Sequence, residues 1–108
     1  EGVLIFTSGN IVHNLRDAFS RMRANNTQTP DWAQRFDETV KAMLTHRDTD
    51  ALLTAWTDAD DGRLAHPTPD HWLPLIYAYG ATDGRDQAHF PNEGFDWGSI
   101  SMRNVVLG

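Results

Sequence analysis

A continuous apolar run near the start of the chain, Val3-Leu4-Ile5-Phe6, most constrains how this sequence can fold. Such a run of strand-forming residues suits a strand that is covered on both faces, as in a parallel or mixed sheet between helices. Residues 7–10 (TSGN) follow it with turn chemistry. We therefore expect a buried central strand over residues 3–6. Because a natural protein seldom begins so close to a central strand, we expect the 108 residues to be part of a longer protein.

The middle of the chain carries the spacing of helices. Thr-Pro-Asp triplets at residues 29–31 and 68–70 each combine an N-cap Thr, a Pro at the first helical position and an Asp in the first turn. The first triplet predicts a helix ending near His46, and the second predicts a helix ending at Gly80. A further helix between them is expected to start at Asp48 or Asp50. The apolar residues predicted to face inward on the first two helices are Trp32, Phe36, Val40, Met43 and Leu44, then Leu52, Leu53 and Trp56.

Three further segments flank these helices. Residues 11–22 are predicted to contain a short helix with Leu15, Phe19 and Met22 on one face. Residues 82–95 are rich in Gly, Asp and Pro and indicate a loop. Residues 100–107 form the predicted final strand. The order of strand, helices and strand predicts an α/β layer fold, not a helical bundle.

The composition argues against several classes of protein. The formal net charge is −6 and the nine basic residues are scattered, so no nucleic acid partner is expected. No apolar run approaches the roughly 20 residues that a membrane span needs, so no membrane partner is expected. The absence of cysteine excludes disulfides and thiolate metal sites, and it fits a cytoplasmic protein. The acidic cluster at residues 58–62 does not match the register of a calcium loop and is interpreted as a solvated helix end.

Two of the five histidines lie where ligands commonly bind. His13 follows the carboxyl end of the first predicted strand, which is where open α/β sheets bind ligands. His71 lies in the first turn of a predicted helix, where the dipole disfavours imidazolium and favours the neutral ring that a metal needs. Position alone leaves an alternative open for each. His13 would then be a loop residue satisfied by backbone groups, and His71 a partly buried first-turn residue.

The other three histidines are interpreted as structural or surface residues. His66 lies before the helix start, across Pro67, so it lacks the i,i+4 spacing of two ligands on one helix face. His46 is expected to be a favourable cation at a helix end, and His89 to be solvated in a loop. Phosphate-binding loops, nucleophile elbows and H-E-x-x-H helices are missing from the sequence.

The segments around His13 and His71 resemble the class III extradiol ring-cleavage dioxygenases of the B-subunit type, in the branch similar to 4,5-DOPA extradiol dioxygenases. The similar segments are residues 8–16 (SGNIVHNLR), 67–75 (PTPDHWLPL), 79–81 (YGA) and 98–102 (GSISM). They occur in the family's order and extend along the whole chain. Each nine-residue segment is fairly specific, and the two together are much more so.

The resemblance implies a fold, a cofactor and a role for each histidine. The implied fold is the C-terminal portion of an α/β/α sandwich around a mixed sheet, with residues 1–108 forming the C-terminal part of one catalytic domain. The implied cofactor is non-haem Fe(II), with Zn²⁺ often in its place. His71 matches a metal ligand. His13 matches an acid/base residue beside the metal that is sometimes counted as a ligand, and the remaining ligands would lie in the N-terminal part.

The reaction implied by the resemblance inserts O₂ into a catechol-type aromatic ring next to one hydroxyl and gives a ring-opened semialdehyde. Two alternatives stay open, namely a catalytically incompetent fragment of this fold and a zinc-binding protein of this fold with another activity. Because such metal sites usually need three protein ligands, the isolated chain is expected to be inactive. A fragment with part of its sheet should expose apolar edges, so self-association is a further expectation.

Overall fold

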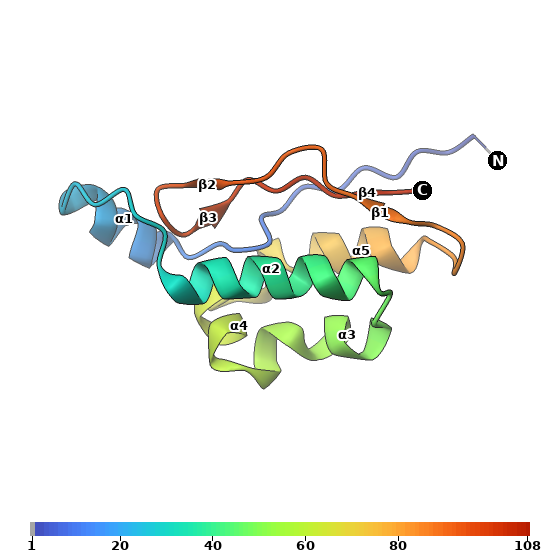
Figure 1. Cartoon of the computed structure of the whole chain (residues 1–108), viewed down its shortest axis with the longest axis horizontal. Coiled ribbons are helices and arrows are strands. Elements are labelled where there is room, and N and C mark those ends of the chain that lie inside the picture. The colour runs from blue at the N-terminus through green and yellow to red at the C-terminus, as the bar shows by residue number, and fades with distance from the viewer. Residues whose placement is uncertain (1) are drawn as a thin grey trace.

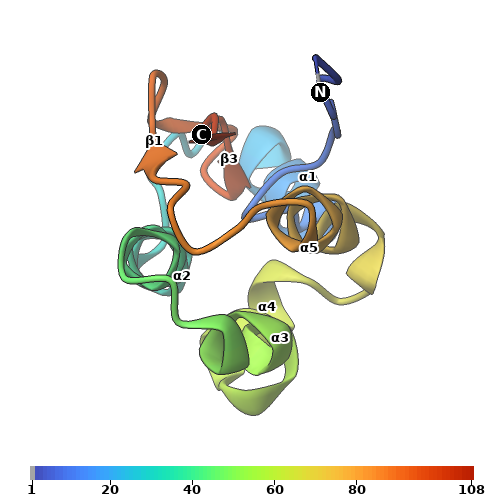
Figure 2. The same cartoon turned by 90° about the vertical axis from the view of Figure 1, so that its right-hand side faces the viewer.

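Helices and short strands form three layers in the structure, a computed structural model that describes residues 2–108. Figures 1 and 2 show the N-terminal segment and the strands on one side, α2 and α5 in the middle, and α3 and α4 on the other side. The helices are α1 (Leu15–Arg23), α2 (Asp31–Thr45), α3 (Thr49–Asp58), α4 (Asp60–Ala65), the 3-10 helix η1 (Pro69–His71) and α5 (Leu73–Gly80). The strands are β1 (Ala88–His89), β2 (Phe95–Asp96), β3 (Ile100–Ser101) and β4 (Val106–Leu107).

The strands pair in two small antiparallel sheets. β1 pairs with β4, and β2 pairs with β3. An isolated bridge joins His13 to Ile100 and so ties the N-terminal segment to β3. The α/β class predicted from the sequence is confirmed. The single final strand predicted over residues 100–107 is divided into β3 and β4, and the predicted loop over residues 82–95 contains β1.

The predicted strand over residues 3–6 is wrong for the part of the chain that the structure describes. Residues 3–6 pair with no strand there, and the side chains of Val3, Leu4 and Phe6 are 79–87% exposed. Apolar composition favours a buried strand, but a strand needs a neighbour that supplies backbone hydrogen bonds and covers its faces. Among residues 2–108 no segment takes that position.

The helical predictions hold best where a helix has two neighbours. α2 starts at the first Thr-Pro-Asp triplet, with Pro30 at the N-cap position, and ends with His46 as its C-cap. Asp48 caps α3 by accepting the backbone N–H of Ala51. The inward face of α2 packs with α3, α4 and Trp72 to form the core, whose most buried side chains include Phe36, Val40, Leu44, Leu52 and Trp72.

Other details of the helices concern exposure. The short helix predicted within residues 11–22 is α1, and its residues Leu15, Phe19 and Met22 are exposed, whereas Ala18 is buried. Leu53 on α3 is also exposed. The acidic stretch at residues 58–62 ends α3 at the exposed Asp58, as predicted for a solvated helix end, and it then starts α4 at Asp60, where Gly62 packs against α3. A Cβ on Gly62 would lie 2.0 Å from the carbonyl oxygen of Ala55, so only glycine permits this approach.

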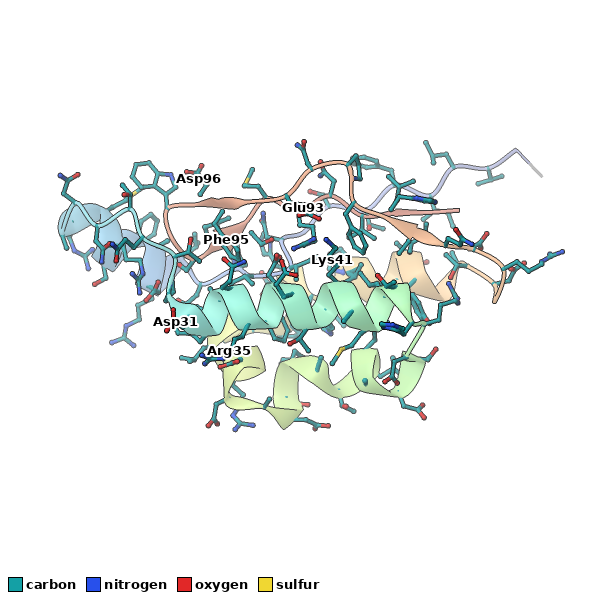
Figure 3. The ribbon with its side chains drawn as sticks, viewed as in Figure 1. Asp31, Arg35, Lys41, Glu93, Phe95 and Asp96 are labelled. Carbon is teal, nitrogen blue, oxygen red and sulfur yellow. The ribbon has the colours of Figure 1, made fainter. Side chains whose placement is uncertain are left out.

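A buried charge cluster joins α2 to the segment that follows β3. Both charged side chains of its central pair, Asp37 and Arg103, are almost fully buried. The Arg103 guanidinium donates through Nε (2.9 Å) and Nη2 (2.6 Å) to the Asp37 carboxylate. It also donates to Glu38 and to Glu93, and Glu93 accepts from Lys41 as well. Figure 3 shows Lys41 and Glu93 on the strand-facing side of α2.

In residues 2–108, the helices are too short or too polar to cross a membrane.

Removing Arg103 should destabilise the protein strongly. Arg103→Met leaves the Asp37 carboxylate buried without its partner, which typically costs about 3–5 kcal/mol of unfolding free energy. Arg85 is a matched control because its ion pair with Asp83 is exposed, and Arg85→Met should leave the unfolding free energy nearly unchanged. Urea unfolding of both variants measures the difference. Equal small losses would show that the buried pair does not hold α2 to the C-terminal segment.

Candidate functional site

His13 and His71 lie against one another, although they come from different elements. Their rings stack in parallel, with centroids 3.5 Å apart and an interplanar angle of 4°. The sequence singled out these two residues from the five histidines, and the structure brings both together. Because stacking holds the nitrogen atoms of two imidazole rings close together, the pair is the candidate site.

His13 is held by its backbone at the start of α1. Its N–H donates to the carbonyl of Ala65 at 3.0 Å, and the residue bridges to Ile100. The preceding residues Ile11 and Val12 are buried in the core, which fixes the direction in which the chain enters the site. Asn14 then caps α1 by accepting the N–H of Asp17 at 3.0 Å. The ring of His13 is therefore carried by a backbone that is fixed on both sides.

His71 ends the 3-10 helix η1, just before the buried Trp72. The turn at Gly9 packs directly on this point, because a Cβ on Gly9 would lie 2.6 Å from the backbone oxygen of His71. The backbone N–H of Asn10 donates to Nδ1 of His71 at 3.2 Å. Since Nδ1 accepts a hydrogen bond, the His71 ring is neutral in this arrangement and its proton is on Nε2.

The electrostatic surroundings also favour a neutral His13. Burial lowers the pKa of His13 below its ordinary value, and the adjacent His71 ring lowers it further. Asp70, which is exposed, acts in the opposite direction. Two neutral imidazoles can stack closely without charge repulsion. Their lone pairs are also the donors that Fe(II) and Zn²⁺ accept.

The donor chemistry of the pair fits a metal centre, but only part of one. No group of three or more His, Asp or Glu side chains that could hold a metal ion occurs among residues 2–108. Catalytic iron and zinc sites usually have three protein ligands. The described residues can therefore contribute ligands to such a site and cannot complete it.

His66 lies beside the stack but has a structural role. It is 2% exposed, and its Nε2 donates to the carbonyl of Ile11 at 2.6 Å. Its ring also packs against the rings of Phe36 and Trp72. Burial lowers the pKa of His66 to about 4. The interpretation of His66 as a structural residue agrees with this environment, and its alternative surface role does not.

The two other histidines lie away from the stack. His46 is exposed at the C-cap of α2, where its Nδ1 lies 2.8 Å from the carbonyl of Ala42, as expected for a helix end. His89 is exposed as predicted, but it lies in β1 and not in a loop.

A hollow of about 750 Å³ borders the site. It is lined by residues 3–11, by α5 and by residues 101–107, and both His71 and Asn10 lie on its wall. Figures 1 and 2 show the N-terminal segment and the C-terminal strands on the same side of the molecule. The hollow gives a ligand access to the His71 end of the stack.

The sequence did not single out the residues that position the rings. The sequence indicates only turn chemistry for Gly9 and Asn10 and a strand position for Ser101, and it gives none of them a role toward His71. The side chain of Asn10 donates to the carbonyl of Ser101 at 2.8 Å, across most of the chain length. A short polar stretch after an apolar run was the one available signal, because such residues commonly bind backbone groups.

Comparison with known proteins reveals relatives along the entire chain. A protein of Escherichia coli (strain K12) named "4,5-DOPA dioxygenase extradiol" is 41% identical over 110 residues, covering 100% of this chain and 40% of the relative. Proteins of the same name from Beta vulgaris and Portulaca grandiflora are each 32% identical over 101 residues, covering 94% and 93% of this chain and 36% of each relative. The chain is related to the extradiol dioxygenases. The resemblance seen in the sequence is thereby confirmed.

A solved structure agrees with this relationship. The crystal structure of uncharacterized protein JW3007 from Escherichia coli K12 superposes with a TM-score of 0.77 at 40% identity, covering 91% of this chain and 40% of that one. No family model matches the chain. The chain thus spans about 40% of the E. coli relative's length. The assignment of residues 1–108 to the C-terminal part of one domain stays a prediction.

His66 should make the protein sensitive to acid. Its pKa is about 4 in the folded protein and 6.5 when unfolded, so the unfolded chain binds the proton more readily. The contribution of neutral His66 to the unfolding free energy is roughly 3 kcal/mol. It is fully present above pH 6.5 and is lost as the pH falls toward 4. His66→Gln, which can still donate to Ile11, should flatten this loss in urea unfolding between pH 7 and 4.5. His46→Gln is the control, and an equal effect of both variants would contradict the assignment.

Proposed function

We propose that this chain forms part of a metal-dependent extradiol dioxygenase that inserts O₂ into a catechol-type aromatic ring next to one hydroxyl and yields a ring-opened semialdehyde. The observation that carries the proposal is the His13–His71 stack, formed by the two segments that resemble this family. The names of the three relatives support the reaction class. The remaining ligands of the metal would come from the part of the longer protein that the relatives have beyond this match.

His71 is the proposed metal ligand and His13 the proposed acid/base residue, and His13 is also proposed as a further ligand. The proposed cofactor is Fe(II), with Zn²⁺ able to occupy the same donors. When bound, Fe(II) would hold the catechol and O₂ together and let electron density pass from the ring to oxygen.

His13 suits proton transfer because its ring is neutral near pH 7. A neutral imidazole can accept the proton of a catechol hydroxyl and return it later in the reaction. Its lowered pKa keeps the ring in the accepting form, and the backbone bonds of His13 hold it next to His71. The hollow beside His71 offers the aromatic substrate a path to this pair.

Anaerobic reconstitution of the full-length protein with Fe(II) tests the reaction. Addition of a catechol such as DOPA, followed by O₂, should produce a yellow ring-fission product with consumption of one O₂ per ring. The zinc-loaded protein is the control and should give no such product. Iron bound at one equivalent without ring opening of any catechol would favour a metalloprotein of this fold with another activity.

The two histidines should differ in what they contribute. His71→Ala in the full-length protein should lower metal content at least tenfold, because a direct ligand is lost. His13→Ala should keep most of the metal and lower turnover by roughly 10²–10⁴-fold, the usual contribution of a general acid/base. His46→Ala, exposed and remote from the stack, should change neither quantity. Metal analysis by mass spectrometry together with kcat measures both effects, and the reverse pattern would refute the assigned roles.

A further inference from the structure

Asn10 connects His71 to the C-terminal strands through two hydrogen bonds. Its backbone N–H donates to Nδ1 of His71 at 3.2 Å, and its side-chain Nδ2 donates to the carbonyl of Ser101 at 2.8 Å. The neighbouring Gly9 lies directly against the His71 backbone. Asn10 therefore fixes the orientation of the His71 ring, while His13 covers one face of that ring.

The anchor of Asn10 is itself rigid. The N–H of Ser101 donates to the carbonyl of Val12 at 2.9 Å, and its Oγ donates to Asp37 at 2.5 Å. Asp37 is held by Arg103 in the buried ion pair. The Ser101 carbonyl that accepts from the Asn10 side chain is thus fixed by the core. The backbone N–H of Asn10 is therefore held in position to donate to His71.

This hydrogen bond is incompatible with a cation on His71, whichever ring nitrogen binds it. A neutral imidazole has one N–H and one lone pair. If a cation binds Nδ1, that lone pair is no longer available to the Asn10 N–H. If a cation binds Nε2, the ring proton must lie on Nδ1, where two N–H groups would face one another. Ligating histidines normally donate from their second nitrogen, and here the second nitrogen accepts.

We propose that Asn10 is a positioning residue that holds the His71 ring against His13, and that its hydrogen bond to His71 is exchanged for the cation when the ring binds metal. The proposal rests on the proposed role of His71 as a ligand. It implies that the turn at residues 8–10 adjusts on metal binding, because the Asn10 amide must find another partner. It also explains why a polar side chain, bonded to Ser101, occupies this position.

Amide hydrogen exchange at Asn10, measured by NMR on the full-length protein with and without Zn²⁺, tests whether metal binding breaks the hydrogen bond from Asn10 to His71. Loss of one hydrogen bond should speed exchange of the Asn10 amide by roughly fivefold when zinc binds. The ring ¹⁵N resonances of His71, recorded on the same samples, report whether that ring coordinates zinc. A residue with a merely structural role would show no dependence on zinc.

Two substitutions separate positioning from general disruption. Asn10→Asp removes the donor to Ser101, so exchange at position 10 should already be fast without metal and should change little on adding zinc. Asn92→Asp makes the same chemical change at an exposed position outside the wall of the hollow, and it should keep the wild-type response. Circular dichroism and thermal melting verify that both variants fold.

The outcomes distinguish this proposal from the proposed function. Zinc coordination by His71 with accelerated exchange at Asn10 supports both. If His71 coordinates zinc while amide hydrogen exchange at Asn10 stays unchanged, the proposed replacement of the Asn10–His71 hydrogen bond is overturned and the ligand role of His71 stands. Zinc binding without any response of the His71 ring, or no zinc binding, overturns the ligand role and this proposal with it. Slow exchange at position 10 in folded Asn10→Asp overturns the anchoring through Ser101.

Discussion

The ion pair between Asp37 and Arg103 is the interaction on which the arrangement of the site depends. It joins α2, the central helix of the core, to the segment after β3, and Ser101 donates to the same carboxylate. The backbone of Ser101 in turn bonds to Val12 and accepts from Asn10. A buried pair adds little net stability over apolar contacts, but each charge requires its partner. The pair therefore restricts the chain to one register between the helices and the segment that carries His13.

The sequence predicts those parts of the fold that depend on residues close together in the chain, and it fails for parts that depend on distant residues. The limits of α2 and the end of α5 follow from local signals within a few residues, and the structure agrees with them. The second Thr-Pro-Asp triplet starts the 3-10 helix η1, and α5 begins only at Leu73. A strand depends on a distant neighbour. Residues 3–6 have the composition of a central strand, yet no partner lies beside them in residues 2–108, so they stay extended and exposed. The same reason explains the exposed apolar face of α1, which meets no opposing surface in the described chain.

The two histidines of the candidate site could be predicted from the sequence, but the residues that position them could not. His13 and His71 are recognisable because the short segments around them resemble a family. Asn10, Ser101 and Asp37 reach His71 through contacts between residues far apart in the sequence, and no local pattern encodes such contacts. Polar residues that follow an apolar run are common in turns, so Asn10 had an ordinary explanation. Its connection to His71 is visible only when the folded backbone brings residues 10, 71 and 101 together.

Burial separates the role of His66 from those of His13 and His71, although the three residues lie close together. His66 is close in sequence to His71, and its ring packs against Trp72. Its Nε2, however, donates to the carbonyl of Ile11 inside the core. A cation could reach it only by displacing that bond and opening the core. Instead, His66 holds Ile11 and so fixes the chain just before His13. His71 lies on the wall of the hollow, and its ring accepts a hydrogen bond from the backbone N–H of Asn10. The buried His66 thus fixes the chain that carries His13 beside His71.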